Sequence, residues 1–169
     1  VIAAYTASRL PLAIGIKPER LPLENVPDMS FVLILKLVVL AGLCGVLAIV
    51  FCVVMKKTKI YSEKLIKNPW LRVVAGAAVF IGITALTRST DYYGTGMNVI
   101  ERAVTEGKAV PYAFALKLVL TALMLGVGFK GGEIVPTFFV GATFGCVIGK
   151  LLGISPGLAA AAGMASLFC

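Results

Sequence analysis

The segment from Phe31 to Met55 constrains the chain more than any other, because its 25 residues include a single charge, Lys36. At 1.5 Å per residue a helix of this length covers about 38 Å, and the hydrocarbon core of a bilayer is about 30 Å thick. Inside lipid the backbone groups of such a segment must bond to one another, which a helix achieves. Phe31 to Met55 is therefore predicted to be a transmembrane helix, and the chain an all-α membrane protein.

Composition favours a bundle of such helices over a water-soluble globule. Hydrophobic residues make up 59% of the 169 residues and charged residues 14%, whereas about a quarter of a soluble domain is charged. The length fits one domain. By polarity, the remaining ranges are predicted to be the end of a preceding helix and a loop (1–30), a transmembrane helix (71–87), a polar turn and short helix (88–108), a transmembrane helix (109–129), a further apolar helix (134–152) and the start of a next helix (157–169).

Several apolar segments are short or interrupted. The uncharged run from Ile134 to Gly149 has 16 residues, too few to span comfortably, and the run after Leu151 is broken at Gly153 and Pro156. In transporters such interruptions mark helices that stop inside the membrane, where free backbone groups line an ion site. We therefore expect tilted transmembrane helices together with re-entrant or half-spanning ones.

The two ends of the chain lie in apolar sequence. It begins at Val1, without a secretory signal, and reaches Cys169 without a polar terminator. Both ends are expected to be internal to a longer domain.

Sixteen Lys and Arg against eight Asp and Glu give a net charge of +8. In a membrane protein such residues set orientation and attract anionic lipid headgroups, so membrane lipid is the expected partner and nucleic acid is not. Six basic residues between Lys56 and Arg72 suggest a cytoplasmic link. Trp70, within that link, is placed as an interfacial anchor.

The cysteines indicate neither a metal site nor a cofactor. Cys44, Cys52, Cys146 and Cys169 lie in apolar runs, form no CxxC pair, and have no histidine in the chain to complete a site. They are predicted to be small apolar fillers, and no metal, cofactor or catalytic residue is expected.

The motif that carries chemistry joins two apolar runs. Four glycines fall between Gly126 and Gly132, and Pro136 follows in the first turn of the next helix. The amides of residues 133–135 would have no intrahelical acceptor and would lie at the positive end of the helix dipole, which attracts anions. The alternative is an ordinary loop whose glycines serve close packing.

Glu133 is the acid within this motif and is flanked by apolar sequence. An acid at membrane depth is costly, so it is a functional candidate by default. Lys130 could instead neutralise it, which would make the pair structural. A second buried charge, Lys117, would snorkel, pair with an acid or face a pore vestibule.

The next helix carries glycines at i, i+4 and i+8, namely Gly141, Gly145 and Gly149. This stripe lets a neighbouring backbone come close, so it is a packing signal.

Gly-Gly-Glu-Ile-Val-Pro followed by Thr-Phe-Phe-Val-Gly-Ala-Thr-Phe-Gly resembles the GxFxP motif of the CLC chloride channels and anion/proton antiporters, together with its helix. The preceding Ala115–Gly126 and the corner Gly94–Ile100 also resemble that family. The resemblance runs from about Phe31 to Cys169 and implies part of a CLC pore domain. It assigns anion binding to Gly131, Gly132, Glu133, Ile134, Val135 and Pro136.

Within this resemblance the motif departs from the usual pattern at its side chains. Ile134 replaces the usual Phe, and Val135 offers no hydroxyl. Glu133 stands where the fluoride-exporting branch has an acid implicated in ion or proton coupling, so it is the coupling candidate.

The resemblance further implies chloride or fluoride as the transported ion, with protons as a possible coupled partner. The protein would be either a channel, which in some members is voltage-gated, or an antiporter. It would form a homodimer in a bacterial plasma membrane. The family's serine loop, gating glutamate and pore tyrosine do not occur in this chain. In that family the link that corresponds to the basic link of this chain is external, whereas the basic residues here suggest a cytoplasmic one. The sidedness of the loops therefore stays open.

Two other hypotheses come from different classes. The glycine stripe suits a structural packing or dimerisation module without transport of its own. An intramembrane enzyme has little support, because the chain has no His and no GxSxG, and Asp91 with Glu133 is a thin pair for acid catalysis.

Overall fold

The computed structural model describes residues 30–87, 92 and 94–169, so the predicted preceding segment (1–30) lies outside the described residues apart from Ser30. Each regular element in these ranges is a helix, which confirms the all-α prediction. The α-helices are α2 (Phe31–Leu65), α3 (Pro69–Thr87), α4 (Met97–Thr105), α5 (Ala113–Val127), α6 (Ile134–Leu152) and α7 (Pro156–Phe168).

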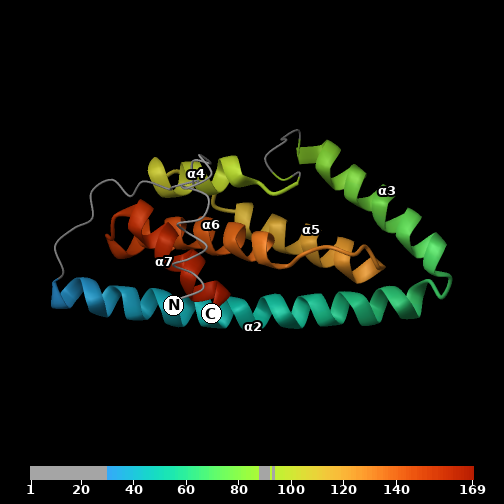
Figure 1. Ribbon diagram of the computed structural model, residues 1–169, viewed down its shortest axis with the longest axis horizontal. Helices are drawn as coiled ribbons and strands as arrows, with labels where there is room; N and C mark the ends of the chain where they lie inside the picture. Colours follow the sequence, from blue (N-terminus) through green and yellow to red (C-terminus); the bar gives the residue numbers. More distant parts are fainter. Residues whose placement is uncertain (1–29, 88–91, 93) are drawn as a thin grey trace, which may run out of the picture.

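Helix α2 runs along one whole side of the molecule (Figure 1). The prediction that this helix ends at Met55 is wrong, because it continues to Leu65 and has 35 residues. The lysines that follow Met55 are polar but are good helix formers, so they extend the helix instead of ending it. The segment predicted as a polar link is therefore mostly helix.

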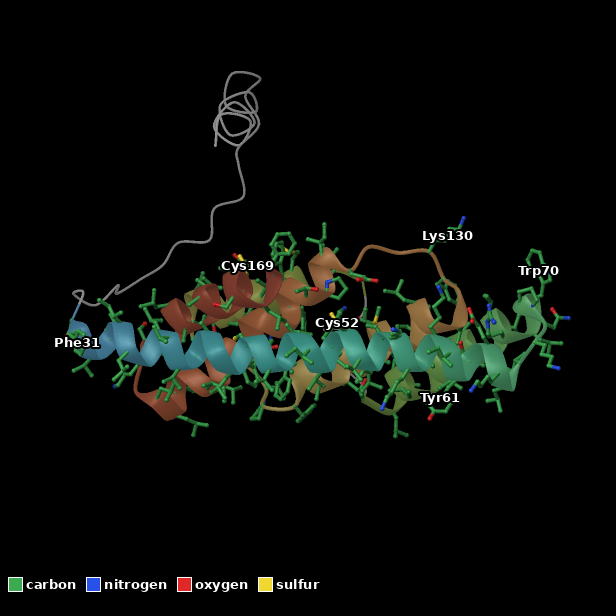
Figure 2. All side chains as sticks on the ribbon, turned by 90° about the horizontal axis from the view of Figure 1, so that it is seen from below. Phe31, Cys52, Tyr61, Trp70, Lys130 and Cys169 are labelled. Atoms are coloured by element: carbon green, nitrogen blue, oxygen red, sulfur yellow. The ribbon has the colours of Figure 1, made fainter. Side chains whose placement is uncertain are left out.

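Helix α3 folds back from the far end of α2 at an angle to it (Figure 1). It begins at Pro69, a residue suited to the first helical turn, and the amide of Trp70 donates to the side-chain oxygen of Asn68 at 3.1 Å. Trp70 is 83% exposed and points outward from the tip of the α2–α3 turn (Figure 2).

Helix α5 is shorter than the predicted range 109–129, since it covers 15 residues. Pro111 disfavours helix in the residue before it, and Gly128, with φ of 111°, ends the helix in the left-handed conformation. Helix α6 covers Ile134–Leu152, the range that the sequence predicted. Its 19 residues are long and apolar enough to cross a membrane, whereas the uncharged run that ends at Gly149 was expected to be too short. Helix α6 continues past Gly149 through Lys150 to Leu152.

Three helices, α2, α3 and α6, are long and apolar enough to cross a membrane, and α5 and α7 are shorter apolar helices. Helix α6 lies at the centre of the packing. On one side its Phe139 and Ala142 join a core with Ile100 of α4. On another side its Val140 packs in a second core with Leu40 of α2. The body of α6 is therefore held firmly, whereas its first residue, Ile134, is 54% exposed.

Candidate anion site

The N-terminus of α6 leaves backbone amides free. The amide of Thr137 donates to the carbonyl oxygen of Glu133 at 3.0 Å, and the Thr137 hydroxyl donates to the same oxygen at 2.7 Å. In the described part of the chain the amides of residues 133–135 have no acceptor, and Pro136 has no N–H to offer. Glu133 is the N-cap residue, and its side chain forms no capping hydrogen bond. Free N–H groups at the positive end of a helix can accept an anion.

The glycines before α6 serve different purposes. Gly126 is tightly packed, since a Cβ there would lie 2.6 Å from the Thr58 side chain, and Gly128 needs its positive φ. Gly131 and Gly132 are exposed. A Cβ on Gly132 would meet nothing within 4 Å, and its φ is ordinary. The described residues therefore leave open space beside Gly132.

The loop before α6 is anchored where α5 ends. The Ser62 hydroxyl of α2 donates to the carbonyl oxygen of Gly126, and Arg72 Nε of α3 donates to that of Val127 at 3.1 Å. Both oxygens belong to the last turn of α5, where carbonyl groups lack intrahelical donors. The negative end of the helix dipole also favours the positive charge of Arg72 there. Sequence reasoning counted Arg72 among the basic residues of the link that follows Met55 and missed this role, because a carbonyl acceptor has no residue-type signal.

Glu133 is exposed and opens onto two cavities. One, of about 520 Å³, lies between α2 and the loop and is also lined by Lys56, Lys59 and Lys130. The other, of about 240 Å³, is also lined by Cys52. Lys56 and Lys59 belong to α2, and their positive charges favour anions in the larger cavity.

The alternative that Lys130 neutralises Glu133 is not observed. Among the described residues an ion pair joins Lys108 to Glu106 at 3.3 Å, and none joins Lys130 to Glu133. The side chain of Lys130 points outward from the loop, away from α2 (Figure 2). The Glu133 carboxylate is therefore not held by its nearest basic neighbour in sequence.

The glycine stripe of α6 packs against α7 of the same chain. A Cβ on Gly141 would lie 2.6 Å from the carbonyl oxygen of Gly163, and one on Gly149 would overlap the Cβ of Ala159. Gly145 lies between these two contacts. This contact fixes the direction of α6, and hence of its N-terminus.

Lys117 neither reaches the surface nor pairs with an acid among the described residues. It is 5% exposed, and its ammonium donates to the carbonyl oxygens of Tyr92 and Gly94 at 3.1 and 2.8 Å. The alternatives of snorkelling and of an acidic partner are thus not observed in this part of the chain.

Long and shorter apolar helices pack around the body of α6, whose N-terminus carries the free amides. This is the arrangement of a polytopic membrane protein, a class in which ions can be held at helix ends. The family model "Voltage gated chloride channel" matches residues 1–169. The chain belongs to this family, the CLC proteins, which are channels and transporters and not enzymes. The enzyme hypothesis thereby loses its ground, and Asp91, its second residue, lies outside the described residues.

Relatives cover nearly the whole chain. A "Chloride/fluoride channel protein" of Pseudomonas syringae pv. tomato is 28% identical over 99% of this chain. A "Voltage-gated ClC-type chloride channel ClcB" of Salmonella dublin is 29% identical over 82% of it. A crystal structure of a CLC-type fluoride/proton antiporter matches 98% of the chain with a TM-score of 0.88 and 33% identity. The chain spans 38%, 34% and 42% of these three proteins, respectively.

Proposed function

We propose that this chain forms part of a pore domain that moves fluoride or chloride across the membrane, and that the amides of residues 133–135 coordinate the anion. The observation that carries this proposal is the group of amides at the N-terminus of α6 that have no acceptor among the described residues. Gly131 and Gly132 support it, because neither has a side chain that would cover these amides and the space beside Gly132 is open. Pro136 supports it as a residue suited to the first turn of a helix. Selectivity would then come from backbone dipoles and pore width.

Fluoride is the ion that we favour. One relative is named for chloride and fluoride, and the similar crystal structure is that of a fluoride/proton antiporter. Glu133 at the start of α6 agrees with the acid expected in the fluoride-exporting branch. Ile134 and Val135 bring apolar side chains to the site, so coordination there falls to their amides.

Glu133 is proposed to couple anion movement to protons. Its carboxylate is exposed at the amides that we assign to the anion, and Lys56, Lys59 and Lys130 line the same cavity. A carboxylate beside an anion site repels the anion when charged and admits it when protonated. Such a group therefore couples the binding of the anion to the binding of a proton.

A packing or dimerisation module gains no support from the glycine stripe. Gly141, Gly145 and Gly149 contact α7 within the chain and are not left for a second copy. A bacterial plasma membrane remains our proposal for the full-length protein, because the relatives named above are bacterial. A homodimer is proposed from the family resemblance alone.

The test is anion efflux from liposomes that contain the full-length protein, followed with fluoride and chloride electrodes in parallel. Glu133→Gln is compared with the native protein and with Glu63→Gln, a matched change at an exposed acid of α2. We expect fluoride-preferring efflux that is lost in Glu133→Gln and kept in Glu63→Gln.

The other outcomes separate the alternatives. Chloride efflux that ignores Glu133→Gln would make this acid a bystander in an ordinary chloride-conducting CLC protein. Absence of any flux from the native protein would overturn the transport proposal and leave the packing module in first place.

A further inference from the structure

Lys117 is a charged side chain in the apolar interior. It lies in the first half of α5, and its two hydrogen bonds go to backbone carbonyls. No carboxylate accepts a hydrogen bond from it in the described ranges. A buried cation is costly at membrane depth, so a residue kept there is a functional candidate.

Three contacts of this ammonium join three parts of the chain. It belongs to α5, it donates to Tyr92 and Gly94 in the corner before α4, and it lies 5.3 Å from the ring centroid of Phe139 in α6. Phe139 is fully buried and follows Glu133 by six residues. The ammonium therefore connects the corner to α6 close to its N-terminus.

The same ammonium shares a cavity with the start of α6. This cavity, of about 190 Å³, is lined by Lys117, Thr121, Gly132 and Pro136 among others. In the protein interior a unit charge acts more strongly over distance than it does in water. A positive charge behind Gly132 therefore favours an anion at the amides that follow.

We propose that Lys117 is a positioning residue of the anion site, which orients the N-terminus of α6 through Phe139 and supplies a fixed positive charge behind Gly132 and Pro136. The proposal rests on the anion site of the proposed function. It assigns the charge itself, and not merely the volume of the side chain, to anion affinity.

The experiment measures binding of sodium fluoride and sodium chloride to the full-length protein by calorimetry. Lys117→Met removes the charge and both hydrogen bonds at similar volume, Lys117→Gln removes the charge but keeps a donor, and Lys117→Arg keeps the charge. Thr121→Val is the matched control, since Thr121 lines the same cavity one turn later. Size-exclusion chromatography reports folding.

We expect both neutral variants to weaken anion binding tenfold or more, and Lys117→Arg and Thr121→Val to stay within threefold of the native protein. Native affinity in a folded Met or Gln variant would overturn the proposal. So would loss of folding in both neutral variants while Arg folds, because the role would then be purely structural. If the native protein itself binds neither salt, it is the proposed anion site that fails.

Discussion

Gly145 of α6 and Ala159 of α7 touch backbone to backbone, so that a methyl group on Gly145 would overlap the carbonyl oxygen of Ala159. Gly145→Ala should therefore force the two helices apart and destabilise the protein by about 1 to 3 kcal/mol. The midpoint of thermal denaturation in detergent checks this.

Gly42→Ala is the matched control for that change. A Cβ on Gly42 of α2 would meet nothing within 4 Å, and alanine is the better helix former. We expect its midpoint to equal or exceed the native one. Equal denaturation midpoints for Gly145→Ala and Gly42→Ala would refute the tight backbone contact between α6 and α7, which we call the seam.

Gly132→Ala separates the proposed site from the fold. The described residues leave room for the methyl group at an ordinary φ, so stability should change by less than about 0.5 kcal/mol. If the anion approaches the amides past Gly132, fluoride efflux should fall at least tenfold. Native efflux in this variant would place the anion elsewhere.

Ser62 and Arg72 should act together on the end of α5. Each donates to a carbonyl oxygen of the last turn, at Gly126 and Val127. Ser62→Ala and Arg72→Met should each destabilise the protein by about 1 to 2 kcal/mol, and a double-mutant cycle on denaturation midpoints should reveal coupling.

The control for Arg72→Met is Lys67→Met, because Lys67 is exposed and has no hydrogen bond among the described contacts. It should leave the midpoint unchanged. If both substitutions lowered the denaturation midpoint equally, the cause would be the loss of a positive charge and not the loss of the hydrogen bond to the Val127 carbonyl.

Cys52 should report whether the cavities beside Glu133 hold water. It is exposed and lines both of them, whereas Cys44 is fully buried. With other cysteines replaced by serine, a water-soluble anionic thiosulfonate should label Cys52 and leave Cys44 unlabelled, as mass spectrometry would show. Failure to label Cys52 would mean that lipid or protein fills this space.

The helical class, the loop and the free amides could be predicted because each depends on residues close in sequence. Run lengths indicate spans, and Pro136 after a group of glycines marks a helix start. The end of α2 was misplaced at Met55, since hydropathy reports membrane depth whereas helix formation follows backbone propensity. The start of α5 was misplaced because Pro111 interrupts the helix without interrupting the apolar run.

Contacts between distant segments could not be predicted in the same way. Lys117 was expected to snorkel, to pair with an acid or to face a pore vestibule, and its two carbonyl acceptors were not foreseen. Every residue carries a carbonyl oxygen, so such a partner has no signal in the sequence. The glycine stripe that includes Gly145 predicted close packing but did not indicate that α7 would be the helix packed against it. Small residues fit any helix that comes near them.

The seam between α6 and α7 bears on how a transport cycle could proceed. Where backbone meets backbone at Gly141, Gly145 and Gly163, there are no rotamers that can rearrange to let one helix slide past the other. The two helices should then move as one rigid body, and tilting α6 alone would require breaking its backbone contacts with α7. A gate at the proposed anion site is thus better sought in a side chain that changes rotamer, such as Glu133, than in a moving helix.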